Sequence, residues 1–245
     1  MSTQNNSSSD VLKQLEQYSM ANWMENLLRF IPAFGSKQLY EVALPGTHDS
    51  GCYTSTFTLY GRAQDQNIKE QLEGGIRYFD LRFCSVTKND TNEFYIKHGV
   101  IDGEGFLKSN VKLENILTDL KEFLTQYSSE LIILHLTHFK DLDSADVCSD
   151  FFDRIFNELS SYLIPNSTST QLSNLLEAGS VILSVDTRDR GDNQIDISNL
   201  SQNQKSYLWD SIPSPYDEPI YQTGDPNMVK AFIESQFDSY QDGFG

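Results

Sequence analysis

The chain has few cysteines, and its apolar runs are short. Its three cysteines, Cys52, Cys84 and Cys148, are an odd number at spacings that match no zinc-binding pattern. We therefore expect free thiols in a reducing compartment. The N-terminal sequence lacks the basic segment and apolar core of a signal peptide, and no apolar run reaches the roughly 18 residues of a membrane helix. A cytoplasmic protein is expected, with peripheral contact to membranes.

Positive charge is also scarce, with 18 lysines and arginines against 35 acidic residues and a net charge of −17. Because affinity for nucleic acid depends on Lys and Arg neutralising phosphates, we expect no nucleic-acid partner. Anionic bilayers would repel the chain too, so a lipid substrate would be approached through a local patch or an apolar rim. A simpler explanation is that the charge keeps the protein soluble. We expect a monomer.

What is present is the composition of a globular protein, 245 residues long with 38% hydrophobic side chains. Residues 1–9 are polar and expected to be disordered, and residues 10–245 are expected to form one domain. Apolar spacing predicts helices at 10–30, 67–73, 113–124, 151–159, 172–176 and 228–237. Short apolar runs predict strands at 38–44, 76–83, 93–97, 131–136, 181–185 and 207–209. Strands that alternate with helices favour a parallel sheet.

All four histidines of the chain fall where a predicted strand ends. They are His48, His98, His135 and His138. One such histidine would usually be structural, but four at successive strand ends indicate a site, because α/β barrels place their active sites there. His138 is a candidate site residue. His135, an odd number of positions away, is expected to face the other side of its strand and to be structural.

Asp80 and Arg82 add a charged pair to these histidines. They lie two positions apart on a predicted strand and so face the same side, whereas Arg77 faces the other way. Either they form a buried ion pair, or the guanidinium binds a phosphate. Two histidines and an arginine can cleave a phosphodiester. One imidazole removes a proton from the attacking hydroxyl, the other protonates the leaving oxygen, and the guanidinium neutralises the phosphoryl oxygens.

Three motifs, in order and at matching spacing, resemble the X region of phosphatidylinositol-specific phospholipase C. They are Leu-Pro-Gly-Thr-His-Asp-Ser at 44–50, Gly-Ile-Arg-Tyr-Phe-Asp-Leu-Arg at 75–82, and His98-Gly99. Segments at 22–24, 137–139 and 208–215 are also similar to eukaryotic X domain-containing proteins. The resemblance implies a distorted TIM-type α/β barrel. It also implies cleavage of a phosphatidylinositol-type phospholipid to cyclic inositol phosphate and diacylglycerol.

The resemblance also implies roles for individual residues. His48 matches the general base, His98 the general acid, and Arg82 the phosphate-binding arginine of the bacterial enzymes. Asp49 matches the carboxylate that partners the acid histidine, and Asp80 a supporting aspartate. A guanidinium stands where calcium-dependent animal enzymes have an acidic ligand, so we expect neither a metal nor another cofactor.

The sequence departs from the family pattern in three respects. Five or six strands are predicted instead of eight. The barrel is therefore expected to be distorted and incomplete. A truncated gene model, a shorter family variant or an open barrel would each explain the missing strands. No segment matches the late aspartate that lies beside the base histidine in bacterial enzymes, so nothing is seen to orient His48. The basic head-group residues of those enzymes are not evident, and His135 or Thr137, and Asp186, stand near their places. We predict that His138 and Asp186 bind substrate.

Two alternatives remain open at this point. One is a weakly active or inactive phosphoinositide-binding module. The other is a phosphodiesterase for a different glycerophospholipid. A metal-using glycerophosphodiesterase is disfavoured, because Arg82 would repel its cation.

Overall fold

The structure is a computed structural model that describes residues 18–54, 61–101, 105–187 and 195–210. The internal contacts divide the chain into Met1–Ser211 and Ile212–Gly245, and only the first unit is described. The tail predicted at 1–9, the start of the helix predicted at 10–30 and the helix predicted at 228–237 lie outside the described residues. The single domain expected over 10–245 therefore stays a prediction.

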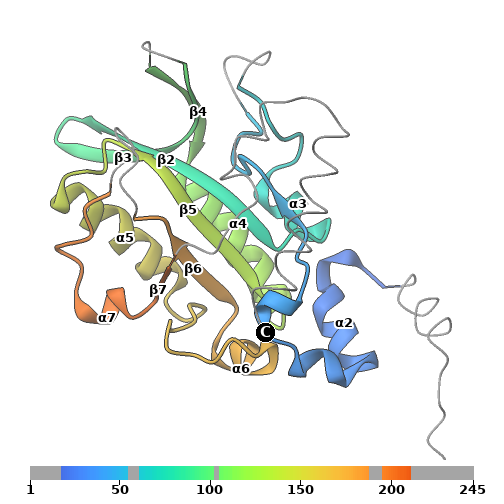
Figure 1. The fold of residues 1–245 in the computed structure, drawn as a ribbon. Coiled ribbons are helices and arrows are strands. Elements are labelled where there is room, and N and C mark those ends of the chain that lie inside the picture. The colour runs from blue at the N-terminus through green and yellow to red at the C-terminus, as the bar shows by residue number, and fades with distance from the viewer. Residues whose placement is uncertain (1–17, 55–60, 102–104, 188–194, 211–245) are drawn as a thin grey trace, which may run out of the picture. The chain divides into compact units, whose positions relative to one another are not determined.

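The described residues contain one seven-stranded mixed sheet (Figure 1). Its strands are β1 (Gly46–Thr47), β2 (Tyr78–Lys88), β3 (Thr91–Ile101), β4 (Gly105–Lys112), β5 (Ile132–Lys140), β6 (Val181–Val185) and β7 (Leu208–Asp210). Their order is β4-β3-β2-β5-β6-β7, and β1 pairs with the first part of β2. The neighbours of β5 and β6 are parallel, whereas β2, β3 and β4 are antiparallel. The expected α/β fold is thus confirmed, and within the described residues the sheet is not closed, which is consistent with a distorted or incomplete barrel.

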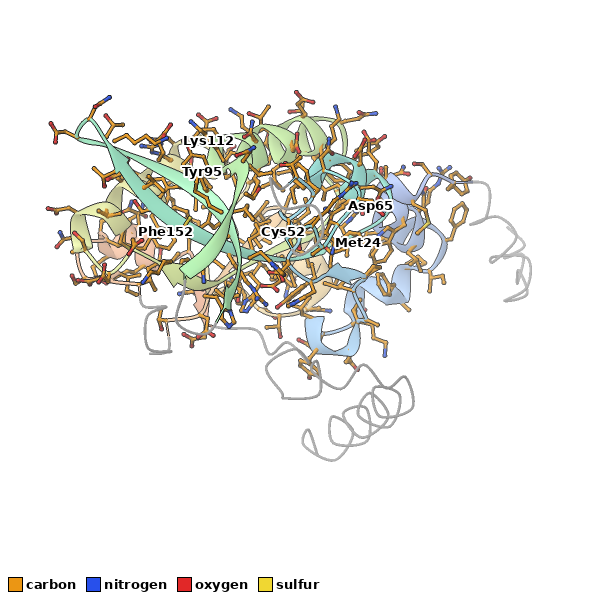
Figure 2. The ribbon with its side chains drawn as sticks, turned by 90° about the horizontal axis from the view of Figure 1, so that it is seen from above. Met24, Cys52, Asp65, Tyr95, Lys112 and Phe152 are labelled. Atoms are coloured by element: carbon orange, nitrogen blue, oxygen red, sulfur yellow. The ribbon has the colours of Figure 1, made fainter. Side chains whose placement is uncertain are left out.

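Six α-helices accompany the sheet in the described residues. They are α2 (Trp23–Phe30), α3 (Ile68–Glu73), α4 (Leu113–Gln126), α5 (Ala145–Leu159), α6 (Leu172–Ala178) and α7 (Gln202–Lys205). Side chains fill the space between helices and sheet (Figure 2). None of the helices in this part of the chain has the length and apolar character needed to cross a bilayer.

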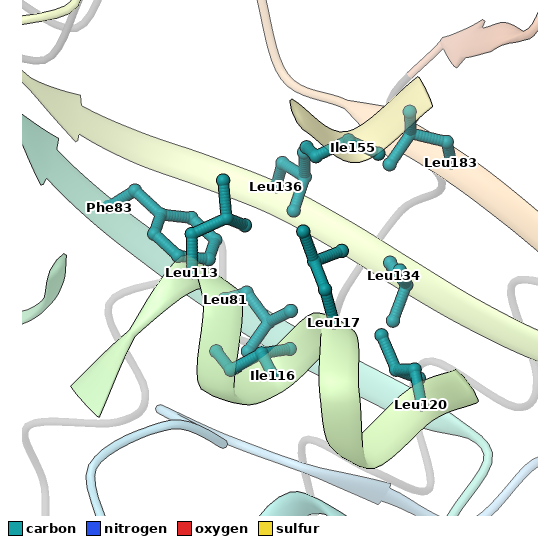
Figure 3. A pocket seen from close by; sticks show the side chains of 10 residues that line it. All are labelled: Leu81, Phe83, Leu113, Ile116, Leu117, Leu120, Leu134, Leu136, Ile155 and Leu183. Atoms are coloured by element: carbon teal, nitrogen blue, oxygen red, sulfur yellow. The ribbon is translucent and has the colours of Figure 1, made fainter. Parts of the chain in front are cut away.

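The main apolar core lies between one face of the sheet and helices α4 and α5 (Figure 3). Alternate residues of β2, β5 and β6 point to this face because side chains alternate along a strand. They meet the apolar stripe of α4 and one residue of α5, and the residues that line the contact are Leu81, Phe83, Leu113, Ile116, Leu117, Leu120, Leu134, Leu136, Ile155 and Leu183. Asp80 and Arg82 therefore belong to the opposite face.

A buried ion pair fixes the N-terminal helix to the sheet. Arg77, at the residue before β2, and Glu130, just before β5, are both fully buried. The Arg77 Nε and Nη2 atoms lie 2.9 and 2.8 Å from Glu130 Oε2. The Glu130 carboxylate also accepts hydrogen bonds from the backbone N–H groups of Met24 and Glu25, in the first turn of α2. The pair thus satisfies two of the N–H groups that a helix start leaves open.

Several predicted elements need correction. The strand predicted at 38–44 is wrong: Leu39–Glu41 is a 3₁₀ turn whose capping box joins Gln38 and Glu41, and the strand begins only after Pro45. Strand β4 was not predicted, and β2 and β3 form an antiparallel hairpin instead of parallel neighbours. The described part of the helix predicted at 10–30 is a 3₁₀ turn, Met20–Asn22, followed by α2.

Candidate active site

The loop after β1 carries the first two candidate residues and is held by two glutamines. The Thr47 hydroxyl donates to Gln71 Oε1 at 2.7 Å, and Gln71 Nε2 donates to the carbonyl oxygen of Ser50 at 2.9 Å. Gln64 Nε2 donates to the carbonyl oxygen of His48 at 2.7 Å. Sequence analysis missed both glutamines, because their role depends on how α3 and its preceding loop pack. No local motif marks them.

The backbone of this loop is strained at Asp49, which has φ of +49°. Non-glycine residues seldom adopt this conformation, and such strain concentrates at functional sites. The Asp49 N–H donates to Asp80 Oδ2 at 3.2 Å. A Cβ atom at Gly51 would lie 2.5 Å from Ile96 Cγ1, so a glycine lets the loop approach β3. This approach brings the loop close to His98, which also lies on β3.

Two imidazoles share one buried carboxylate. His48 Nε2 lies 3.2 Å from Asp49 Oδ2, and His98 Nε2 lies 3.3 Å from the same oxygen. His48 Nδ1 lies 2.8 Å from Asp80 Oδ2. The imidazole side chains are 32% and 30% exposed, whereas those of Asp49 and Asp80 are 2% and 8% exposed. Two partly exposed imidazoles thus contact buried carboxylates.

Arg82 completes the cluster. Its Nη2 atom lies 3.0 Å from Asp80 Oδ2 and 3.4 Å from His48 Nδ1, and its Nε atom lies 3.1 Å from Asp49 Oδ1. The Arg82 side chain is 15% exposed. The ion pair considered for Asp80 and Arg82 is therefore present. It holds a guanidinium beside both carboxylates and the His48 ring.

These contacts shift the pKa values of Asp80 and His98 in opposite directions. Burial opposes ionisation of Asp80, but the hydrogen bond from His48 and the charge of Arg82 outweigh burial and hold the pKa of this carboxyl below its usual range. The hydrogen bond with Asp49 raises the pKa of His98. Both His48 nitrogens face carboxylates, and the contact of Nδ1 with Asp80 Oδ2, at 2.8 Å, is shorter than that of Nε2 with Asp49 Oδ2, at 3.2 Å. We therefore assign the proton of the neutral ring to Nδ1, which leaves Nε2 as the nitrogen that can accept one.

Among the described residues, His48, Asp49 and Asp80 could hold a metal ion, since one ligand atom from each lies within 4.8 Å of the others. The Arg82 guanidinium already lies within 3.4 Å of an atom of each of these three residues. A divalent cation would have to displace this guanidinium or bear its repulsion. The donor set therefore fits a guanidinium better than a metal.

The prediction that His135 faces away from the site is wrong. His135 is the register partner of Asp80 on the neighbouring parallel strand, so both side chains lie on the same sheet face. It is buried, and its Nδ1 lies 3.1 Å from Ser184 Oγ. Strict alternation of side chains between His135 and His138 does not hold in this strand. The chain is irregular there, since the β2–β5 register shifts after Arg82 and His138 has φ of +49°.

His138 and Asp186, the predicted substrate-binding residues, lie at strand ends. His138 is near the C-terminal end of β5, partly exposed, with Nδ1 2.9 Å from Thr137 Oγ1. Asp186 directly follows β6, is buried, and donates its backbone N–H to the carbonyl oxygen of Leu136 at 2.9 Å. Their roles stay predictions.

Known proteins are similar to this chain in sequence. A family model described as phosphatidylinositol-specific phospholipase C, X domain, matches residues 46–183. The 1-phosphatidylinositol phosphodiesterase of Staphylococcus aureus (strain Newman) is 30% identical over 143 residues, which cover 57% of this chain and 40% of that protein. Human PI-PLC X domain-containing protein 2 is 30% identical over 148 residues, which cover 50% of this chain and 45% of that protein.

Solved structures share the fold. The phosphatidylinositol-specific phospholipase C from Listeria monocytogenes has a TM-score of 0.50 at 24% identity, covering 69% of this chain and 57% of that one. A structure of the Staphylococcus aureus enzyme has a TM-score of 0.54 at 20% identity, covering 76% and 60%. The chain spans less than half the length of the curated relatives named above. The match over 46–183 shows that the chain belongs to the phosphatidylinositol-specific phospholipase C X domain family.

Proposed function

We propose that this chain is a metal-independent phospholipase C-type enzyme that cleaves phosphatidylinositol-like phospholipids. The observation that carries the proposal is the shared carboxylate: His48 Nε2 and His98 Nε2 lie 3.2 and 3.3 Å from Asp49 Oδ2, beside the Arg82 guanidinium. The family membership and the names of the two curated relatives support the reaction class.

The reaction would proceed in one displacement. His48 Nε2 removes the proton from the inositol 2-hydroxyl, and the freed oxygen attacks phosphorus. The bond between phosphorus and the glycerol oxygen breaks, and His98 donates its proton to that oxygen. Arg82 neutralises the charge that develops on the phosphoryl oxygens. The products are a cyclic inositol phosphate and diacylglycerol.

The carboxylates prepare the two imidazoles for opposite tasks. Asp80 Oδ2, 2.8 Å from His48 Nδ1, would hold the base in its working tautomer, the role that the family assigns to a later aspartate. Asp49 raises the pKa of His98 and so keeps it protonated as an acid. Arg82 would replace the charge of a cation, because its planar fork suits phosphate oxygens.

The remaining expectations complete the proposal. His138 and Asp186, at the ends of β5 and β6, would bind the head group. We propose a cytoplasmic monomer that makes peripheral contact with membranes and has no nucleic-acid partner.

The test is product release from phosphatidylinositol dispersed in detergent, followed by ³¹P NMR. The wild type should release cyclic inositol phosphate, and excess EDTA should leave its rate unchanged. His48→Ala and His98→Ala should each lower kcat by about 100-fold or more, because general acid–base groups contribute roughly 10²–10⁴-fold.

Lys121→Ala, an exposed substitution on α4, serves as the control and should turn over like the wild type. Wild-type rates in either histidine variant would refute the assignment, and inactivation by EDTA would refute metal independence. Binding to inositol phospholipid without turnover would instead favour the non-catalytic module.

A further inference from the structure

Five of the chain's 11 lysines gather in one stretch of the sheet face that carries Arg82. Register places this stretch: Cys84 pairs with both Tyr95 and Lys140, and Tyr95 pairs with Lys112. Lys97, two residues beyond Tyr95, pairs with Lys108. The five are Lys88, Lys97, Lys108, Lys112 and Lys140. For a chain with a net charge of −17, this is a local concentration of positive charge, which Glu93 and Asp141 partly offset.

Three of these lysines, Lys88, Lys108 and Lys112, surround the ring of Tyr95, and together with it they are called the Tyr95 cluster. The Lys108, Lys112 and Lys88 ammonium groups lie 3.5, 5.3 and 5.8 Å from the ring centroid. Figure 2 shows Tyr95 and Lys112 side by side. Such cation–π contacts hold ammonium groups in place. Glu93 pairs with both Lys88 and Lys112, so three positive charges face one negative charge.

The cluster adjoins the active site on the side where the site should open. Phe83 pairs with Ile96, so Lys97 lies beside Arg82 across the β2–β3 ladder. From Arg82, β2 continues outward through Cys84 to Lys88, beyond its pairing with β5. In α/β barrels the site opens at the C-terminal ends of the parallel strands. The Tyr95 cluster therefore extends outward from the catalytic residues.

Three of the five lysines both surround Tyr95 and reach the surface. Lys88 and Lys112 are 58% and 41% exposed, and Lys108 is partly exposed. Lys97 is 2% exposed. Burial and the charge of Arg82 lower the pKa of Lys97 to about 8, which marks it as an interior residue of the site.

We propose that Lys88, Lys108 and Lys112 form a docking surface for an anionic lipid bilayer. This proposal rests on the proposed function, since a lipid-cleaving site must meet a membrane at its opening. The rest of the chain would be repelled by anionic head groups, whereas lysines near the surface attract them. Ammonium groups held on one aromatic ring suit phosphate and carboxylate head groups.

The test is sedimentation of the full chain with sucrose-loaded vesicles of phosphatidylcholine, with and without phosphatidylserine and without inositol lipid. The wild type should bind only the phosphatidylserine vesicles. The triple variant Lys88→Gln, Lys108→Gln, Lys112→Gln should bind them about tenfold more weakly, because each lysine near an anionic surface contributes attraction and Glu93 offsets part of it. Lys88→Gln alone, at the most exposed of the three, should show a smaller loss even if the triple variant misfolds.

The matched control is Lys37→Gln, Lys69→Gln, Lys121→Gln. It removes the same charge from three exposed lysines that each pair with a glutamate elsewhere. Equal weakening in this control, unchanged binding of the Tyr95-cluster variants, or no preference of the wild type for phosphatidylserine would overturn the proposal. Because the vesicles contain no substrate, these outcomes are independent of whether the chain has phospholipase activity.

Discussion

Asp49 contacts both the proposed base, His48, and the proposed acid, His98. Its Oδ2 atom lies 3.2 and 3.3 Å from the two imidazoles, and its Oδ1 atom lies 3.1 Å from Arg82 Nε. A carboxylate that accepts a hydrogen bond from an imidazolium stabilises the charged form, which is why the pKa of His98 is raised. The acid therefore keeps its proton to higher pH than a free histidine would.

Replacing Asp49 should move the alkaline limb of the pH–rate profile. Without the carboxylate, His98 would lose its proton at lower pH, so in Asp49→Asn the alkaline limb of kcat/KM should shift toward lower pH. The control Asp150→Asn removes a surface carboxylate on α5 and should leave the limb in place. An unshifted limb in Asp49→Asn would show that this carboxylate does not hold the His98 proton.

The sequence predicted which residues meet, but not all of their contacts. His48, Asp49, Asp80, Arg82 and His98 come together because their motifs lie on, or directly after, the adjacent strands β1, β2 and β3. The contact between Asp80 Oδ2 and His48 Nδ1 could not be predicted, since it depends on the left-handed turn at Asp49. The face of His135 was predicted wrongly because an irregularity in the strand interrupts the alternation of side chains.

Helix α2 depends on a buried ion pair with the sheet. Glu130 accepts hydrogen bonds from Arg77 and from the first turn of α2. Burial raises the pKa of Glu130, and the nearby charge of Arg77 opposes this rise. Removing one partner of such a pair leaves the other charge buried, which usually costs more than the pair itself contributes.

We expect Glu130→Gln to lower the free energy of unfolding by about 3 kcal/mol. Urea unfolding followed by circular dichroism measures this change. Glu122→Gln, which breaks the exposed pair with Lys69, should leave the unfolding midpoint almost unchanged. A midpoint for Glu130→Gln equal to that of the control would mean that the pair contributes little.

Helices with clear apolar stripes were predicted well, whereas short and irregular strands were not. The stripe at 113–124 became α4, and the continuous apolar run at 131–136 became the start of β5. The pattern at 38–44 looked like a strand, but the Gln38–Glu41 capping box stabilises a 3₁₀ turn. Strand β4 was missed because its sequence, Gly-Phe-Leu-Lys-Ser-Asn-Val-Lys, lacks clean alternation. Strand β4 forms because its backbone pairs with β3, and this long-range contact cannot be read from the local sequence.

Taken as a whole, the molecule concentrates its proposed chemistry in a small part of the chain. The five clustered residues lie between positions 48 and 98, on the loop after β1 and on β2 and β3, inside the matched family region. In the described residues the sheet does not close, and the five residues of the proposed proton-transfer centre still meet. The alternation of strands and helices predicted an α/β fold with a parallel sheet, and the resemblance to the family implied the barrel. The antiparallel pairing of β2, β3 and β4 could not be predicted in the same way, because it depends on long-range contacts.

The central claim is that His48 acts as the base and His98 as the acid, and substrates with different leaving groups test it most directly. The two alanine variants are compared on phosphatidylinositol and on inositol p-nitrophenyl phosphate, whose leaving group needs no proton. We predict that His98→Ala recovers most of its lost rate on the activated substrate, whereas His48→Ala does not. Recovery by His48→Ala instead, or equal loss by both variants on both substrates, would contradict this assignment.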